Sequence, residues 1–260
     1  MESPKHDLTI SLVQTEIIWH KASENCQHLE QQLATIAKTD LIILPEMFNS
    51  GFTMHAEKVA ETMSGPTVNW LKKMAEQHQA AITGSLVIKE NGQNYNRMVF
   101  AEPDGTVTYY DKRHLFRMAN EQQRYGAGNE RKVINWRGWR LGLYVCYDLR
   151  FPVWCRNQND TDLMLFIASW PAVRSYPWQM LLKARAIENL CYVCGVNRIG
   201  TDNNGTEHSG DSAIIDMLGQ EVVSLESSSA IITNTISASK LADFRAQFPA
   251  WMDSDSFEII

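Results

Sequence analysis

Short apolar runs alternate with amphipathic stretches along nearly the whole of this 260-residue sequence. Apolar runs of strand length predict strands over Leu8–Thr15, Asp40–Pro45, Ala81–Lys89, Arg97–Glu102, Thr106–Tyr110, Arg140–Val145, Leu163–Ala168, Cys191–Arg198, Ser212–Asp216, Glu221–Leu225 and Ile231–Ser237. Apolar residues at helical spacing predict helices over Ser23–Lys38, Thr67–Gln79, Phe151–Gln158, Ser175–Leu190 and the first part of Ser239–Ile260. Strands and helices interleaved in this way are typical of an α/β fold.

The helix predicted over Ser175–Leu190 carries Met180, Ala184, Ile187 and Leu190 on one side. The polar segment Arg117–Arg131, with its glycines, is too polar for a core and long for a simple turn.

Charge and composition limit the classes of function. The chain carries 24 Lys+Arg against 30 Asp+Glu, a formal net charge of −6, and 44% of its residues are hydrophobic. A mildly acidic chain with scattered cations lacks the basic face that a nucleic-acid-binding protein needs. No apolar stretch approaches the roughly 20 residues of a membrane span, and there is no repeat, linker or composition break. We therefore expect a single domain over residues 1–260, with neither nucleic acid nor membrane as a partner.

The cysteines and histidines predict neither a disulfide nor a metal site. Five cysteines, with no apolar signal-peptide core near the N-terminus, are typical of reduced thiols in a cytoplasmic protein. Cys191 and Cys194 form a CxxC pattern, but residues three apart on a strand point to opposite faces. The seven histidines show no metal-ligand spacing.

Polar residues with useful chemistry follow three of the apolar strands. Glu46 follows Asp-Leu-Ile-Ile-Leu-Pro, Lys112 follows Thr-Val-Thr-Tyr-Tyr-Asp, and Cys146 follows Leu-Gly-Leu-Tyr-Val. Ligand sites in α/β sheets collect where strands end, so these side chains could share one site. Each residue alone also fits an ordinary role, as a buried structural cysteine, a solvated loop carboxylate or a surface lysine.

Each of the three residues has a matching chemical role. Cys146 is a candidate nucleophile, and we expect a following helix N-terminus and a nearby cation to lower the pKa of its thiol. Glu46 is a candidate general base because a partly desolvated carboxylate can take a proton. Lys112 is a candidate cation for stabilising an oxyanion.

The motifs LPEMFNSGF, DKRHLF and CYDLRFP, in this order, resemble those of the nitrilase (carbon–nitrogen hydrolase) superfamily. The resemblance spans almost the whole chain, from SLVQT near its start to GDSAIIDMLGQ near residue 215. CYDLRFP resembles the amidase branch that includes the omega-amidases. The resemblance implies a four-layer α-β-β-α sandwich, assembly as a homodimer or higher homo-oligomer, and a reaction that needs no metal or organic cofactor.

Site roles follow from the same resemblance. Glu46 matches the general base, Lys112 the cation at the oxyanion and Cys146 the nucleophile, with the main-chain N–H of Tyr147 completing the oxyanion hole. Many members carry a second catalytic glutamate shortly after the lysine.

Two glutamates of this chain could fill that second place. Glu121 fits it, and Glu130 is close enough in the sequence to be the alternative.

Candidate pocket residues surround these motifs. They are Phe116, Arg117, Arg150, Trp170 and Arg174. A substrate carboxylate favours an arginine fork, and the sequence leaves open which arginine supplies it. His114, two residues after Lys112, is an alternative base for Cys146 or a hydrogen-bond donor behind the site.

The resemblance predicts an amidohydrolase whose small-molecule substrate is a short 2-oxo dicarboxylate monoamide, such as 2-oxoglutaramate or 2-oxosuccinamate. Hydrolysis would yield the dicarboxylate and ammonia through a cysteine thioester. The alternatives are another amidase or an N-carbamoyl hydrolase of the superfamily, a catalytically silent scaffold with this fold, and a thiol-redox protein that uses Cys191 and Cys194.

Overall fold

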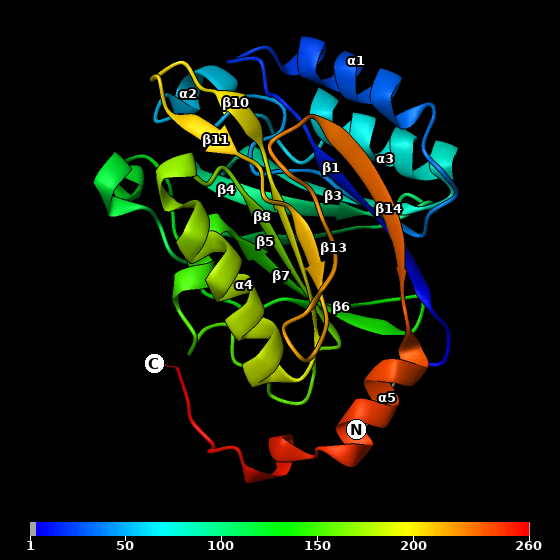
Figure 1. The fold of residues 1–260 in the computed structure, drawn as a ribbon. Helices are drawn as coiled ribbons and strands as arrows, with labels where there is room; N and C mark the ends of the chain where they lie inside the picture. Colours follow the sequence, from blue (N-terminus) through cyan, green and yellow to red (C-terminus); the bar gives the residue numbers. More distant parts are fainter. Residues whose placement is uncertain (1–3, 260) are drawn as a thin grey trace.

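Two six-stranded mixed sheets form the centre of the protein. The structure is a computed structural model that describes residues 4–259 (Figure 1). The first sheet has the order β14-β1-β2-β3-β4-β5, with β1 Leu8–Gln14, β2 Leu41–Ile43, β3 Ala81–Glu90, β4 Gln93–Ala101, β5 Val107–Asp111 and β14 Ala230–Ile236. The second has the order β13-β12-β9-β8-β7-β6, with β6 Val133–Trp136, β7 Trp139–Val145, β8 Leu163–Ala168, β9 Tyr192–Asn197, β12 Ala213–Ile215 and β13 Glu221–Ser224.

Helices cover the outer faces of the two sheets. The α-helices are α1 Ala22–Leu33, α2 Ala56–Val59, α3 Pro66–His78, α4 Ser175–Asn189 and α5 Ala238–Gln247. α1 and α3 pack on the first sheet through a cluster that includes Leu29, Leu71 and Ile82. α4 lies along the second sheet, where β9 has Gly195 beneath Leu182. A separate hairpin, β10 Ile199–Thr201 with β11 Glu207–Ser209, lies near the N-terminal end of α4 (Figure 1).

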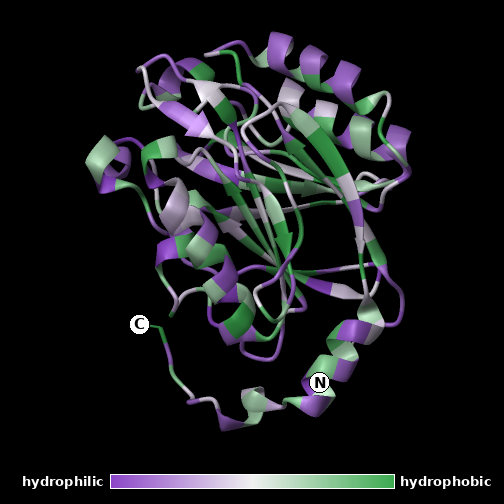
Figure 2. Cartoon of the chain, viewed as in Figure 1, coloured by the Kyte–Doolittle hydropathy of each residue, from purple (hydrophilic) through white to green (hydrophobic). Residues whose placement is uncertain are grey.

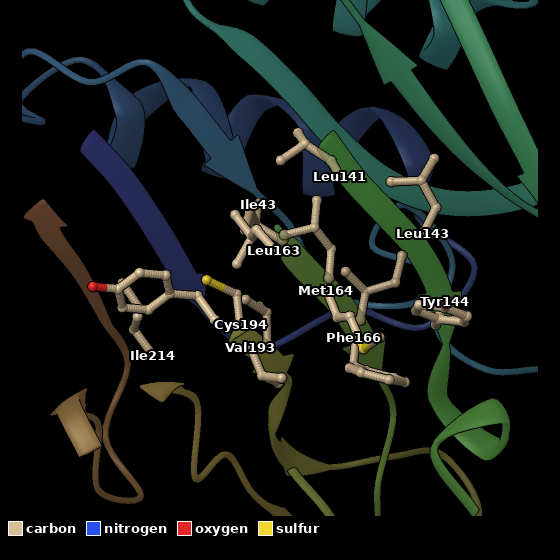
Figure 3. Close-up of a cluster of buried hydrophobic side chains, with 14 of the residues drawn as sticks. Ile43, Leu141, Leu143, Tyr144, Leu163, Met164, Phe166, Val193, Cys194 and Ile214 are labelled. Carbon is tan, nitrogen blue, oxygen red and sulfur yellow. The ribbon is translucent and has the colours of Figure 1, made fainter. Parts of the chain in front are cut away.

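The inner faces of the two sheets share one apolar core. Ile43 of the first sheet points into the same cluster as Leu141 and Leu163 of the second (Figure 3). Hydrophobic residues gather on the strands between the helical layers, whereas α1 is largely hydrophilic on its outer side (Figure 2). The predicted four-layer α-β-β-α sandwich is therefore confirmed. Within residues 4–259, no helix is both long enough and apolar enough to cross a membrane.

Strand direction brings the three predicted site residues to one edge. β2 runs parallel to β3, and β5 also points that way because it is antiparallel to β4, which is antiparallel to β3. In the second sheet β7, β8 and β9 are parallel. The carboxyl ends of β2, β5 and β7 lead directly to Glu46, Lys112 and Cys146.

The prediction of a helix over Phe151–Gln158 is wrong. Cys146–Arg150 forms a short 3-10 helix, and the chain after it is a turn followed by irregular backbone. Asn157 explains much of this: its amide donates to the carbonyls of Thr161 and Asn189, and its side-chain oxygen accepts from the N–H of Asp160. Such side-chain bonds to backbone groups compete with helical hydrogen bonds.

The buried side of α4 also differs from the apolar side that the helical spacing of the sequence predicted. Trp178, Leu182 and Ala186 face the second sheet, whereas Ile187 is 51% exposed. Arg185, although charged, is also buried, because its guanidinium reaches the main-chain oxygen of Leu149. Charge alone is therefore a poor guide to which side of this helix faces inward.

Candidate active site

Cys146 lies at a sharp turn where β7 ends. Its φ is 47°, a left-handed conformation that costs a non-glycine residue about 1–3 kcal/mol. The 3-10 helix Cys146–Arg150 starts at this residue, and the half-buried thiol lines a cavity of about 620 Å³. The turn therefore presents the sulfur to the cavity at the carboxyl end of a strand.

Glu46 is fully buried beside this thiol. Its Oε1 accepts hydrogen bonds from Lys112 Nζ at 3.0 Å and Asn96 Nδ2 at 2.7 Å. Its Oε2 accepts from the main-chain N–H of Ser169 at 2.8 Å, and the charge of the same carboxylate acts on the thiol of Cys146, which lines the same cavity. Ser169 follows β8 of the second sheet, whereas Glu46 follows β2 of the first. The hydrogen bond between them therefore links the two sheets.

Lys112 is buried between two carboxylates. Its Nζ lies 3.0 Å from Oε1 of Glu46 and 3.1 and 3.0 Å from the two oxygens of Glu121. Burial alone would favour the neutral amine, but the charges of Glu121 and Glu46 outweigh it and raise the pKa of Lys112 well above its usual value. Lys112 is therefore a fixed cation next to the sulfur.

Glu121 occupies the place predicted for a second glutamate. Besides Lys112, it accepts the main-chain N–H of Phe116 at 2.6 Å, and it is fully buried. Burial raises the pKa of Glu121, and the neighbouring Lys112 opposes that effect. The side chain of Glu130, the alternative, is 75% exposed and pairs with Lys132. The structure thus brings Glu121, and not Glu130, into the cluster.

The expectation of a lowered pKa for the Cys146 thiol is wrong for the resting site. Burial and the charge of Glu46 raise its pKa well above the usual value, and the opposing effect of Lys112 is smaller. The main reason is that the fold buries the sulfur, and the negative charge of Glu46 adds to this effect. A thiol that stays protonated needs a base within reach, and Glu46 is the carboxylate whose charge acts most strongly on it.

Of six predicted residues, the five pocket candidates and Tyr147 of the predicted oxyanion hole, five line the cavity. They are Phe116, Tyr147, Arg150, Trp170 and Arg174. The sixth, Arg117, is exposed and does not belong to the cavity wall. The cavity is also lined by Trp19, the segment Phe52–His55 and residues of the β10–β11 hairpin.

The two unassigned arginines of the pocket have similar surroundings. The Arg150 guanidinium lies 5.0 Å from the ring of Trp170, and that of Arg174 lies 5.5 Å from the ring of Phe116. Within residues 4–259, neither guanidinium forms an ion pair or donates a hydrogen bond. Trp170 links the two, because its indole N–H donates to the main-chain oxygen of Arg174 at 2.7 Å.

Other candidates lie away from the sulfur. His114 Nδ1 is 2.8 Å from Oδ1 of Asp148, so its ring is engaged elsewhere and does not act on Cys146. Cys191 and Cys194 are free thiols buried in the shared core. Among the described residues, no group of three histidine, cysteine or acidic side chains is arranged to hold a metal ion.

Asn96 and Ser169 are parts of the site that the sequence analysis missed. Asn96 falls one residue before the predicted strand, yet alternation places it on the same face as Met98 and Phe100. A polar residue on an otherwise apolar face was therefore an available signal. Ser169 contributes a main-chain N–H, which leaves no trace in the sequence.

Comparison with known proteins identifies the family. The sequence model that describes the carbon–nitrogen hydrolase family matches residues 9–246 of this chain. This chain belongs to the carbon–nitrogen hydrolase family. The predicted superfamily is therefore confirmed.

Among the relatives of this carbon–nitrogen hydrolase is omega-amidase YafV of Escherichia coli (strain K12), 47% identical over 97% of this chain and 98% of that protein. The 2-oxoglutaramate amidase of Bacillus subtilis (strain 168) is 32% identical over 94% of this chain and 96% of that protein. A crystal structure of XC1258 from Xanthomonas campestris, a CN-hydrolase superfamily protein with an arsenic adduct in the active site, is 50% identical, with a TM-score of 0.96 over 98% of this chain and 100% of that one.

Substitution of Glu121 tests the buried cluster. Glu121→Gln keeps the shape of the side chain but removes one of the two charges that hold Lys112, and we expect amide turnover to fall by about 100-fold. The matched variant Glu130→Gln, on the surface, should leave turnover within about twofold of wild type. Steady-state ammonia release measures both. Equal effects of the two variants would contradict the placement of Glu121 in the catalytic cluster.

Proposed function

We propose that this protein is an omega-amidase that hydrolyses the terminal amide of short 2-oxo dicarboxylate monoamides, such as 2-oxoglutaramate and 2-oxosuccinamate. The observation that carries the proposal is the buried cluster of Glu46, Lys112 and Glu121 beside the Cys146 thiol, which shares a cavity with Glu46 and Lys112. The near full-length similarity to omega-amidase YafV supports the substrate class.

The proposed reaction begins at the thiol. Glu46 takes the proton of Cys146 as the sulfur attacks the amide carbon, and a C–S bond forms while the carbonyl oxygen becomes an oxyanion. The Lys112 ammonium and the main-chain N–H of Tyr147 stabilise that oxyanion. Glu121 keeps Lys112 in place and charged.

Collapse of the tetrahedral intermediate breaks the C–N bond. Glu46 returns its proton to the leaving nitrogen, so ammonia departs and a thioester remains on Cys146. Glu46 then takes a proton from water as the oxygen attacks the thioester. The C–S bond breaks, the dicarboxylate leaves and the thiol regains its proton.

Arg150 and Arg174 are the proposed sites for the substrate's carboxylate. Both line the cavity of Cys146, and neither is engaged by a carboxylate of the described chain. A guanidinium that is held over an aromatic ring and still has free N–H groups is well suited to bind a carboxylate. Tyr147, Phe116 and Trp170 provide the apolar walls around the methylene groups.

Turnover of 2-oxoglutaramate tests the proposed substrate class. We expect wild type to release ammonia from it and Cys146→Ala to be at least about 1000-fold slower, because no thioester can form. A different result would be that the wild-type protein fails to hydrolyse 2-oxoglutaramate and instead forms a Cys146 acyl adduct with other amides or N-carbamoyl compounds. That result would support the alternative of another amidase or N-carbamoyl hydrolase. Absence of both turnover and adducts would favour a catalytically silent scaffold.

Selectivity for charged substrates tests the two arginines. Arg150→Gln and Arg174→Gln should each lower kcat/KM for 2-oxoglutaramate by about 10- to 100-fold, the worth of a charged hydrogen bond. Turnover of butyramide, which has no carboxylate, should change by less than about threefold. Arg117→Gln is the matched control because Arg117 lies outside the cavity. The same loss on both substrates would argue against carboxylate binding.

We also propose that residues 1–260 form one catalytic domain. We further propose that the protein is located in the reducing cytoplasm. The core shared by the two sheets supports the first point, since strands from β1 to β14 contribute to it. The five free cysteines support the second, because thiols persist in reducing compartments.

Homodimer formation is proposed through the outer face of α4. Four apolar residues on or beside this face are strongly exposed: Val173 at 86%, Tyr176 at 73%, Ile187 at 51% and Leu218 at 58%. Exposed apolar residues gathered on one face are typical of a surface that another protein covers. A second copy of the chain is the simplest occupant, because a two-fold interface uses the same face twice.

Introducing charge on this face tests the dimer. Ile187→Glu should shift the protein from the mass of two chains to that of one in sedimentation equilibrium, since a buried unpaired carboxylate opposes association. Ile18→Glu, at an exposed apolar residue before α1, is the matched control and should keep the dimer. A monomeric wild type, or a dimer that survives Ile187→Glu unchanged, would contradict the assignment.

A further inference from the structure

The carboxylate of Asp148 is fully buried and accepts four hydrogen bonds. Its Oδ2 accepts the main-chain N–H of Val145 at 3.0 Å and the hydroxyl of Tyr110 at 2.7 Å. Its Oδ1 accepts the main-chain N–H of His114 at 2.9 Å and the ring Nδ1 of His114 at 2.8 Å. Carboxylate oxygens accept hydrogen bonds, so the tautomer of His114 that fits this contact is the one with the N–H at Nδ1.

These bonds join the two loops that carry the reactive groups. Val145 directly precedes Cys146, while Tyr110 and His114 lie two residues before and two residues after Lys112. A single carboxylate therefore ties the end of β5 to the end of β7.

Aromatic stacking extends the same connection to Tyr147. The His114 ring stacks on Phe151 with centroids 3.7 Å apart and an interplanar angle of 6°. Phe151 in turn meets the Tyr147 ring edge-on at 5.1 Å, and Phe116 meets Tyr147 from another direction at 5.1 Å. Tyr147 is thus held by its side chain as well as by the neighbouring Asp148.

The turn at Cys146 needs such anchors because its left-handed backbone is strained. Asp148 holds the residue before the cysteine, through the N–H of Val145. On the other side, the buried guanidinium of Arg185 donates to the main-chain oxygen of Leu149 at 2.6 Å. Rotation of the peptide between Cys146 and Tyr147 would redirect the Tyr147 N–H, so the direction of that N–H depends on both anchors.

We infer that Asp148, held by His114 and Tyr110, is a positioning residue that aims the Tyr147 N–H at the carbonyl oxygen during attack by Cys146. This inference rests on the proposed thioester chemistry. It assigns a role to the Asp of CYDLRFP and to His114, neither of which contacts the reacting atoms.

The hydrogen-bond pattern explains why an amide cannot replace this carboxylate. Each oxygen of Asp148 faces one main-chain N–H, from Val145 on one side and from His114 on the other. In Asp148→Asn, the NH₂ group must therefore face an N–H donor in either orientation of the amide. The substitution preserves volume but breaks one of the two main-chain anchors.

Two kinds of reaction at the same sulfur separate positioning from general damage. Amide hydrolysis develops an oxyanion, whereas alkylation of Cys146 by iodoacetamide displaces iodide at a saturated carbon and develops none. For Asp148→Asn we expect kcat for 2-oxoglutaramate to fall by about 100- to 1000-fold, as for loss of an oxyanion donor, with KM changed by less than about threefold. The alkylation rate should stay within about fivefold of wild type.

Substitutions at His114 provide a second test in case Asp148→Asn does not fold. His114→Asn keeps an N–H donor near the position of Nδ1, whereas His114→Leu has no donor. We expect His114→Leu to lower kcat by about tenfold and His114→Asn to recover most of the loss. Asp160→Asn is the control, since this partly exposed carboxylate pairs with Arg131 away from the cavity.

Each outcome decides between the hypotheses. Full activity of Asp148→Asn, or equal loss of hydrolysis and alkylation in the variants, would overturn the positioning role while leaving the proposed function in place. A wild type that hydrolyses no amide would overturn the proposed function and this inference together. Selective loss of hydrolysis, with rescue by His114→Asn, is the result that the positioning role requires.

Discussion

The burial of Lys112 between Glu46 and Glu121 is the interaction on which the rest of the site depends. Removing an ammonium and two carboxylates from water is costly, and a buried charge is tolerated only when it is paired and hydrogen-bonded. Here the lysine uses its protons on three carboxylate oxygens, and Asn96 and a main-chain N–H satisfy further lone pairs of Glu46. Loss of Lys112 would leave two carboxylates in the interior without a counter-ion.

The two-sheet architecture makes this cluster possible. Glu46 and Lys112 come from the first sheet, whereas Cys146 and the N–H of Ser169 come from the second. Parallel strands end at one edge of each sheet, and the shared apolar core holds the two edges against each other. The cavity is therefore lined by residues that follow strands of both sheets, together with loops and the β10–β11 hairpin.

Much of this arrangement follows from local sequence patterns, and the parts that do not have identifiable reasons. Within residues 4–259, eleven of the strands and four of the five α-helices were predicted, because their apolar periodicity is strong, whereas the short elements β6, β10, β11 and α2 were not. The strand exits pointed to Glu46, Lys112 and Cys146. The helix after Cys146 was a wrong prediction because side-chain bonds of Asn157 to the backbone compete with helix formation. The expectation of a lowered pKa for the Cys146 thiol was wrong because the burial of the sulfur and its nearness to Glu46 are properties of the folded chain.

The position of the Cys146 thiol beside Glu46 makes the proposed first proton transfer an exchange inside the protein. When the proton moves from sulfur to carboxylate, the total charge enclosed by the sheets stays the same and only its position changes. Shifting a charge over a short distance costs far less than bringing one from water into a low-dielectric interior. Lys112 serves as counter-ion before and after the shift, so the nucleophile is generated without any ion entering or leaving the site.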